Sequence, residues 1–299
     1  MLPFTTPFEE DGNIHVEALR SNLKRWNQTD VKGYVALGST GERVHLNERE
    51  YVQVIGIARS EVPLDRAFIA GAGQQSTRGT IEEIRLAANA GADAALVLTP
   101  YFYRSAITQD GLITFFISVA DSSPVPVLLY SMPILTGVTI EPETIARLSE
   151  HQNIIGVKDS SADVPRFKRT MELVRRDDFV ILTGNGTVLL DCLRAGAYGA
   201  ILAVGCVTPE ICTELFKAMS AGDEKRAAQL QEVLTPLARA VTIEFGIGGL
   251  KASMEMVGYK GGLVRPPLKM PDERGRRQIA ALLDTALESA KISAHTVTS

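Results

Sequence analysis

The stretch Ile154-Ile155-Gly156-Val157-Lys158-Asp159 is a short apolar run that ends in a lysine and an aspartate. It is rich in β-branched residues and its polar and apolar positions do not alternate, which is typical of a parallel strand covered on both faces. Six further runs of this kind precede residue 205, and a partial eighth run opens the chain. In chain order the expected strands are 2–6, 33–37, 67–70, 94–98, 125–130, 154–158, 179–182 and 200–204.

Segments with helical character lie between these runs. Examples are 47–60, 80–90, 142–151 and 209–220. Some carry start signals, such as Thr208 directly before Pro209. Eight strands that alternate with helices predict an α/β fold, a (β/α)8 TIM barrel. A doubly wound open sheet is the alternative, but the glycine-rich fingerprint that such a fold needs after its first strand is missing.

No strand signal follows Gly222. The segments 223–241, 246–257 and 271–291 read as helices with polar faces. The sequence therefore predicts two domains, a barrel over 1–222 that carries the active site and a C-terminal helical domain over 223–299.

The composition is that of an ordinary globular protein of 299 residues, with 45% hydrophobic and 22% charged residues. The net charge is only -4 and the basic residues are dispersed, so neither a nucleic-acid nor an anionic-membrane partner is expected. No apolar run reaches the roughly 18 residues of a membrane span, and the start of the chain lacks the pattern of a secretory leader. We expect a cytoplasmic protein.

Metal and disulfide chemistry are not indicated. The three cysteines, Cys192, Cys206 and Cys212, have neither paired spacing nor neighbouring histidines, which favours a reducing compartment and a packing role. The four histidines are scattered and no His-Glu-x-x-His or Asp-rich loop is present. We therefore expect no metal and no organic cofactor.

Lys158 is the first candidate for chemistry. In a barrel the C-terminal ends of the strands converge on one mouth, where active sites lie. Burial at a strand end would disfavour the charged ammonium form, and an uncharged amine adds to carbonyl carbon to form a Schiff base. The alternative is a lysine whose amine merely extends from the strand end into solvent.

Two other strand ends carry suitable groups. Gly38-Ser39-Thr40-Gly41-Glu42 offers backbone N–H and hydroxyl groups to a carboxylate, although such a cluster is also typical of a simple turn. Leu129-Tyr130-Ser131-Met132-Pro133 places a phenol on the expected strand next to that of Lys158, where it could move protons. A tyrosine that caps the core is the alternative for Tyr130. The aromatic loop at 99–104 is more typical of packing against a neighbouring subunit.

These motifs resemble the dihydrodipicolinate synthase and N-acetylneuraminate lyase family of pyruvate-dependent class I aldolases. The first is similar to the family's carboxylate-binding segment, the second, with Thr136-Gly137, to its tyrosine segment, and Gly156-Val157-Lys158-Asp159 to its Schiff-base segment. The resemblance runs nearly end to end. It implies a barrel followed by a helical domain, and a homotetramer.

The resemblance also implies roles for individual residues. Lys158 would form the imine, Tyr130 would shuttle protons and Ser39 would relay them. The substrate-binding residues would be Thr40 and Gly41 at the carboxylate of a 2-oxo acid, Ile201 through its backbone carbonyl, Ser160 and Tyr103.

Departures from the family pattern bear on the second substrate. Dihydrodipicolinate synthases usually have a second tyrosine where this chain has Phe102, and a carboxylate-binding arginine where it has Leu135. Phenylalanine cannot relay a proton and leucine cannot hold a carboxylate. Tyr103 is the alternative source of a phenol. The acidic pair that sialic-acid lyases use is replaced by small residues around 184–187.

The segments 119–131, 156–160 and 245–251 are most similar to 4-hydroxy-2-oxoglutarate aldolases. The sequence therefore predicts a Schiff-base lyase that makes or breaks a C–C bond between pyruvate and an aldehyde, with glyoxylate as the aldehyde. The first alternative is a 4-hydroxy-tetrahydrodipicolinate synthase that condenses pyruvate with aspartate semialdehyde, or another 2-keto-3-deoxy acid aldolase or dehydratase. A non-catalytic pyruvate-binding protein is the second alternative.

Overall fold

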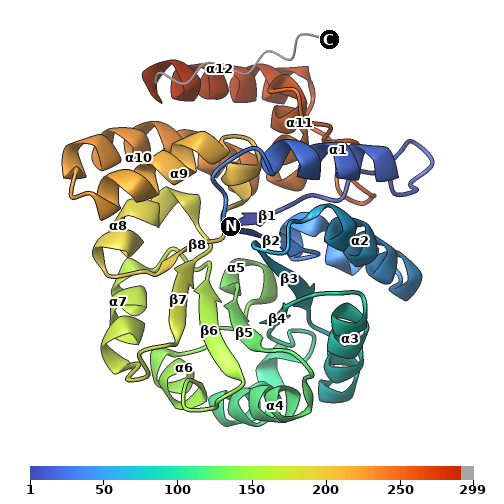
Figure 1. The fold of residues 1–299 in the computed structure, drawn as a ribbon, viewed down its shortest axis with the longest axis vertical. Helices are drawn as coiled ribbons and strands as arrows, with labels where there is room; N and C mark the ends of the chain where they lie inside the picture. The colour runs from blue at the N-terminus through green and yellow to red at the C-terminus, as the bar shows by residue number, and fades with distance from the viewer. Residues whose placement is uncertain (291–299) are drawn as a thin grey trace.

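The computed structural model describes residues 1–290, which form one curled sheet of eight parallel strands surrounded by helices (Figure 1). The strands pair in chain order. Their bounds are β1 Leu2–Pro3, β2 Gly33–Ala36, β3 Ala67–Ala72, β4 Ala94–Leu98, β5 Val127–Ser131, β6 Ile154–Asp159, β7 Val180–Thr183 and β8 Gly199–Ala200. Two backbone hydrogen bonds join the ends of the sheet: the Met1 nitrogen donates to Ala200 O at 2.8 Å, and Leu202 N donates to Met1 O at 3.2 Å.

The α/β prediction and its eight parallel strands are confirmed, with corrections at several strand ends. The first strand, expected over 2–6, ends at Pro3. The expected strand 200–204 is wrong after Ala200, because Ala203–Cys206 forms a 3-10 turn in which Gly205 N donates to Leu202 O at 3.2 Å. The fifth strand begins at Val127 rather than at residue 125. Pro126 has no N–H with which to extend the ladder, although its carbonyl accepts from Ala95 N.

Helices follow most strands and lie around the outside of the sheet in Figure 1, except the short α5, which is drawn over its centre. Their bounds are α1 Val16–Trp26, α2 Glu48–Glu61, α3 Thr77–Asn89, α4 Gln109–Ser122, α5 Pro133–Thr136, α6 Pro142–Leu148, α7 Val164–Leu173, α8 Leu189–Arg194 and α9 Pro209–Ser220. Helix α2 begins with a capping box, in which the Asn47 side chain accepts from Glu50 N and the Glu50 carboxylate accepts from Asn47 N, each at 3.0 Å.

Three more helices follow residue 222 and lie together at one end of the molecule in Figure 1. They are α10 Glu224–Arg239, which continues into a π turn at Ala240–Glu244, α11 Gly246–Met256 and α12 Glu273–Ala290. The helices expected at 223–241, 246–257 and 271–291 are therefore present, although α11 ends at Met256 and α12 begins only at Glu273. Residue 291 lies outside the described residues. Within residues 1–290 none of the helices is both long enough and apolar enough to cross a bilayer.

The strands bury side chains on both faces. One cluster, which includes Val35, Leu96, Leu128, Tyr130 and Ile201, fills the inside of the curled sheet. Two larger clusters pack between the sheet and the helices. Because successive side chains of a strand point to opposite faces, Tyr130 on the inner face fixes which residues of its neighbours share that face.

Candidate active site

Lys158 and Tyr130 lie side by side on the inner face of the sheet. Strands β5 and β6 pair so that these two residues stand opposite each other. Only 4% of Lys158 and 3% of Tyr130 is exposed. The Lys158 amine lies 4.3 Å from the centroid of the Tyr130 ring, and no carboxylate of residues 1–290 forms an ion pair with it. The two residues that the sequence predicts as imine former and proton shuttle are thus neighbours.

Ser39 completes this group from a distant part of the chain. Its Oγ lies 3.0 Å from the Tyr130 hydroxyl, although 91 positions separate the two residues. The contact forms because β2 delivers Ser39 to the same end of the sheet as β5 and β6. Ser39 is therefore hydrogen-bonded to Tyr130, and the Lys158 amine lies against the ring of the same tyrosine.

The turn that carries Ser39 also has the geometry of an anion site. Ser39–Gly41 is a 3-10 turn in which Gly41 N donates to Gly38 O at 3.0 Å and Glu42 N donates to Ser39 O at 3.1 Å. The N–H groups of Ser39 and Thr40 are assigned no partner within the described part of the chain. These two donors, with the Thr40 hydroxyl, are available to a carboxylate.

Two residues in the left-handed region bracket this turn. Leu37 has φ 54° and Glu42 has φ 57°, a conformation that costs a non-glycine residue about 1 to 3 kcal/mol and persists only where the surroundings fix it. On one side the fixing element is β3, since an added Cβ at Gly71 would lie 2.2 Å from Leu37 O. On the other side Glu42 is held by Lys251 of α11, whose side chain is fully buried. The sequence analysis missed Lys251, because only the fold brings it to this turn.

Gly184 shapes the space around the lysine. An added Cβ at this position would lie 2.7 Å from Lys158 Cε and 1.9 Å from Ser160 Oγ. Ser160 is itself 6% exposed, and its hydroxyl has no hydrogen-bond partner among residues 1–290. Ser160, which the sequence predicts to bind substrate, therefore lies beside the lysine. Gly184 entered the sequence analysis only as a small residue in place of an acidic one, and its steric role follows from the packing of β7 against β6.

Of the other predicted substrate-binding residues, Ile201 is buried inside the sheet, whereas Tyr103 lies exposed on the surface. Ile201 follows β8 directly, is fully buried in the inner cluster and donates its N–H to Thr183 O at 2.9 Å. Tyr103 is 72% exposed, and its ring packs edge-on against Phe102 with centroids 5.1 Å apart. Within the described chain, the Tyr103 phenol forms no hydrogen bond with the Lys158 group. The chain on its own does not bring Tyr103 to the lysine.

The cysteines are in packing positions. Cys192 and Cys206 are buried and none of the three is in a disulfide. Burial raises the pKa of the Cys192 thiol to about 11 and that of Cys212 to about 12. Across residues 1–290 no three His, Cys, Asp or Glu side chains are grouped as metal ligands.

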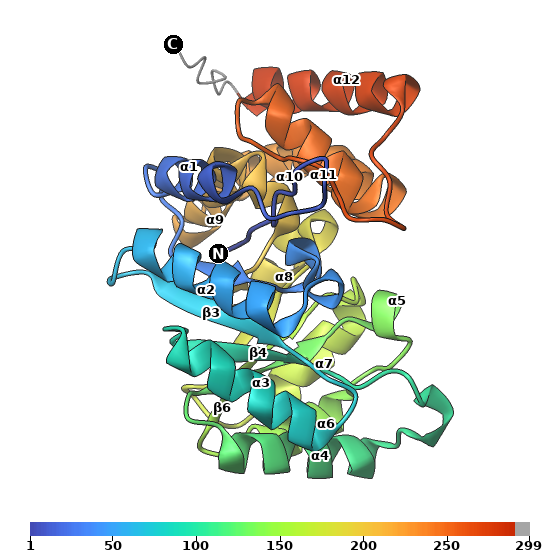
Figure 2. The same cartoon turned by 90° about the vertical axis from the view of Figure 1, so that its right-hand side faces the viewer.

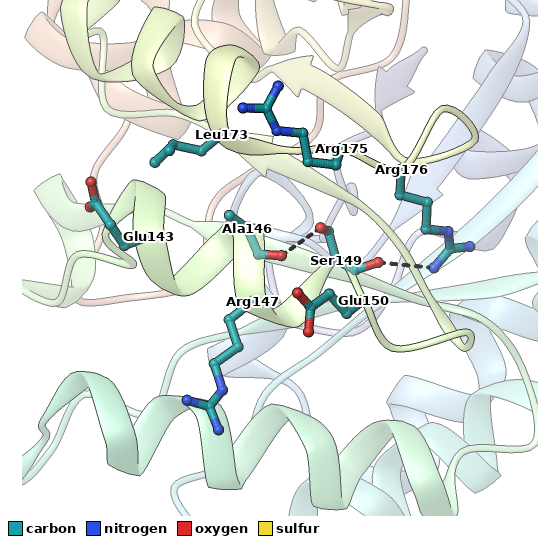
Figure 3. A pocket seen from close by; sticks show the side chains of 8 residues that line it. All are labelled: Glu143, Ala146, Arg147, Ser149, Glu150, Leu173, Arg175 and Arg176. Carbon is teal, nitrogen blue, oxygen red and sulfur yellow. Dashed lines mark hydrogen bonds between the residues drawn. The ribbon is translucent and has the colours of Figure 1, made fainter.

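Two open clefts on the surface lie away from Lys158. One is lined by Arg147, Arg175 and Arg176 together with Glu143 and Glu150, beside α6 (Figure 3). The Arg176 guanidinium there is occupied by the carbonyls of residues 149, 151 and 154 and by the Asp178 carboxylate. A second cleft runs between α1 and α9. Neither is lined by Lys158, Tyr130 or Ser39.

Comparison with known proteins agrees with this geometry. Residues 1–286 match the model of the dihydrodipicolinate synthetase family. The chain is 38% identical over 271 residues to the 4-hydroxy-tetrahydrodipicolinate synthase of Methanothrix thermoacetophila, which covers 90% of both chains. It is 39% identical over 266 residues to that of Methanopyrus kandleri, which covers 88% of both.

Solved structures of the family superpose closely. The dihydrodipicolinate synthase of Thermotoga maritima is 28% identical, with a TM-score of 0.91 over 95% of this chain and 97% of the other. A prophage protein of the dihydrodipicolinic acid synthase family from E. coli, solved in complex with pyruvate, is 29% identical, with a TM-score of 0.88 over 98% of both chains. The resemblance seen in the three motifs thus extends to the whole fold. This chain belongs to the dihydrodipicolinate synthetase family, and it is a lyase of that pyruvate-dependent class.

Proposed function

We propose that the protein is a Schiff-base lyase that acts through the Lys158 amine. It either joins pyruvate to an aldehyde or cleaves a 4-hydroxy-2-oxo acid into these two compounds. The observation that carries this proposal is the grouping of Lys158, Tyr130 and Ser39. The buried Lys158 amine has no carboxylate partner among residues 1–290 and lies against the ring of the buried Tyr130, whose hydroxyl is hydrogen-bonded to the half-buried Ser39. Packing alone would explain the buried Tyr130 ring beside Ser39, but it would not explain a buried lysine amine next to them. A lysine in the same place suits nucleophilic addition to a carbonyl.

In the cleavage direction the Lys158 amine adds to C2 of a 4-hydroxy-2-oxo acid, and loss of water gives the iminium. Tyr130, assisted by Ser39, takes the proton of the C4 hydroxyl. The electrons of the C3–C4 bond pass to the iminium, the aldehyde leaves, and an enamine of pyruvate forms. Protonation at C3 and addition of water then release pyruvate and return the free amine. The synthetic direction runs through the same enamine.

The carboxylate of the 2-oxo acid is assigned to the turn at Ser39–Gly41. The N–H groups of Ser39 and Thr40, which have no hydrogen-bond partner among residues 1–290, and the hydroxyl of Thr40 support this placement. Ser160, buried beside Lys158 with a hydroxyl that lacks a partner in the described chain, is assigned to the bound substrate. We assign the Ile201 carbonyl to the same pocket.

Two aldehydes compete as second substrate. The names of the relatives favour aspartate semialdehyde, and with it a 4-hydroxy-tetrahydrodipicolinate synthase, over the 4-hydroxy-2-oxoglutarate aldolase that the sequence analysis preferred. We therefore place the synthase first. The aldolase stays a candidate because Leu135 is apolar and 63% exposed where synthases usually have an arginine, and glyoxylate is a smaller aldehyde.

The imine is tested by borohydride reduction in the presence of pyruvate. The expected result is a stable mass increase on the peptide that contains Lys158, and its absence in Lys158→Ala. Protein that folds and binds pyruvate but stays unmodified would instead indicate a non-catalytic pyruvate-binding protein.

The aldehyde is identified in two parallel assays on the same preparation. One follows pyruvate release from 4-hydroxy-2-oxoglutarate with lactate dehydrogenase, and the other follows condensation of pyruvate with aspartate semialdehyde. The larger kcat/KM decides between aldolase and synthase. Activity with neither substrate, in a protein that borohydride labels, would direct the search to 2-keto-3-deoxy acids.

We also propose that the protein is a homotetramer in which a second copy covers the aromatic loop. Phe102 and Tyr103 are 70% and 72% exposed, and Ile134 and Leu135 are 66% and 63% exposed. Figure 2 shows the β4–α4 loop and α5 projecting from the same side. Exposed apolar groups of this size are typical of an interface. Sedimentation should give a tetramer, and Phe102→Asp should give smaller species.

A further inference from the structure

A buried ion pair lies outside the reacting group, between α11 and the turn that follows β2. Lys251 Nζ donates to Glu42 Oε1 at 2.6 Å, and the two side chains are 0% and 1% exposed. The same amine donates to Thr6 O and Leu263 O, also at 2.6 Å. An ammonium group has three protons, and each has an acceptor here.

The other oxygen of the Glu42 carboxylate is bound as well. Glu42 Oε2 accepts from Arg265 N at 3.1 Å and lies 3.1 Å from Nδ1 of His45. The Arg265 guanidinium in turn holds the Glu50 carboxylate. The carboxylate of Glu42, the last residue of the Gly38–Glu42 motif, is thus held by Lys251 and by the backbone N–H of Arg265, which both lie in the C-terminal third of the chain.

Removing two charges from water is costly, and an apolar pair of similar size often stabilises a fold as well or better. Stability alone therefore does not explain a buried Lys251–Glu42 pair.

The pair acts on the turn at Ser39–Gly41. Glu42 ends that turn in the left-handed region and donates its N–H to Ser39 O. Thr6, whose carbonyl Lys251 holds, donates its hydroxyl to Gly41 O at 2.8 Å. Lys251 therefore contacts the turn by two routes. One is its direct bond to the Glu42 carboxylate, and the other runs through Thr6, which binds both Lys251 and Gly41 O. A strained backbone persists only where its surroundings fix it, and here the fixing groups come from α11.

We propose that Lys251 and Glu42 are positioning residues for the carboxylate of the 2-oxo acid. The pair holds the Ser39–Gly41 turn from the C-terminal helices so that its N–H groups face the substrate. This inference rests on the proposed function of the turn, and it gives the helices beyond the sheet a part in substrate binding. Neither residue touches the reacting atoms.

The ionic state of the lysine fits this role. Burial lowers the pKa of Lys251 to about 8, while the charge of Glu42 and its hydrogen bond oppose that fall. At pH 7 the ammonium form dominates, and all three of its protons are used. A neutral side chain of similar length would leave the Glu42 oxygen and two carbonyls without their shared donor.

The test compares trapping of two ketones on Lys158 by borohydride. Pyruvate has a carboxylate and acetone has none, so only pyruvate depends on the turn. In Lys251→Met the pyruvate concentration that gives half-maximal trapping should rise at least tenfold, as expected when a charged hydrogen-bonding group is removed. Acetone trapping should change less than twofold. Lys251→Arg should restore much of the pyruvate binding, and Lys225→Met, an exposed lysine of α10, should behave as wild type.

The double variant Glu42→Leu/Lys251→Met separates positioning from stability. Removing both charges should recover thermal stability relative to Lys251→Met, yet pyruvate trapping should stay weak. Wild-type pyruvate trapping in this variant, or an equal loss for acetone and pyruvate in Lys251→Met, would overturn the inference. If Lys251→Met does not fold, the same pyruvate and acetone trapping is measured on Glu42→Gln, for which the same results are expected. Wild-type protein that pyruvate never labels would refute the proposed function itself.

Discussion

Gly184→Ala is the change that most directly probes the geometry of the lysine. The added methyl group would lie 2.7 Å from Lys158 Cε, about 0.7 Å short of the 3.4 Å at which ordinary contact begins. It would also lie 1.9 Å from Ser160 Oγ. The serine hydroxyl can rotate away, whereas the lysine side chain is buried between β5 and β7 and must shift along its length.

The expected cost has two parts. Overpacking of this kind destabilises a fold by about 1 to 3 kcal/mol. A displacement approaching 1 Å at a reacting group lowers its rate on the order of 100-fold. We therefore expect Gly184→Ala to fold, to lose 1 to 3 kcal/mol of unfolding free energy, and to lose about two orders of magnitude in the rate of borohydride trapping at saturating pyruvate.

The matched control is Gly199→Ala. Its added Cβ would lie 3.7 and 4.0 Å from Leu182 and Phe216, which is ordinary contact, so trapping should not change. The double variant Ser160→Ala/Gly184→Ala should regain stability but not rate, because the contact with Lys158 persists. Trapping within threefold of wild type in Gly184→Ala would refute the reasoning, since the amine would then not depend on the space at this glycine.

Three further predictions follow from the same contacts. Tyr130→Phe should keep imine formation measurable but lower kcat for C–C cleavage at least 100-fold, because the phenol that receives the proton of the C4 hydroxyl is gone. If the variant and the wild type had equal kcat, another group would have to receive that proton. The KM for pyruvate should rise above pH 8, because Lys251 then loses its third donor proton in the folded protein. The charged and titratable groups near this amine are Glu42, Arg265 and His45. The rise in KM should be absent in Lys251→Arg, whose side chain stays charged. Native protein at pH 8 should not react with a disulfide reagent at Cys192, whose thiol has its pKa raised by burial, and full reaction should appear only on unfolding in guanidinium.

The strand ends that matter most were predictable from local sequence. Parallel strands covered on both faces need continuous apolar residues, so 94–98 and 154–158 carry their own signal. A lysine at the end of such a run is conspicuous because burial of an amine is rarely needed for packing. Weakly patterned ends were not predictable in the same way, as the turn after Ala200 shows, because its residues suit either a strand or a turn.

Local sequence was enough to predict the α/β alternation of the chain, and it singled out Lys158 and Tyr130 at strand ends and Ser39 in the turn after a strand. It did so because strand periodicity and residue chemistry are local properties. Three features could be read only from the folded chain: the space that Gly184 leaves for Lys158, the exposure of Tyr103, and the ion pair between Lys251 and Glu42 across 209 positions. Those features depend on distances between segments that no local pattern encodes, since they arise when the sheet curls and the C-terminal helices pack against its turns.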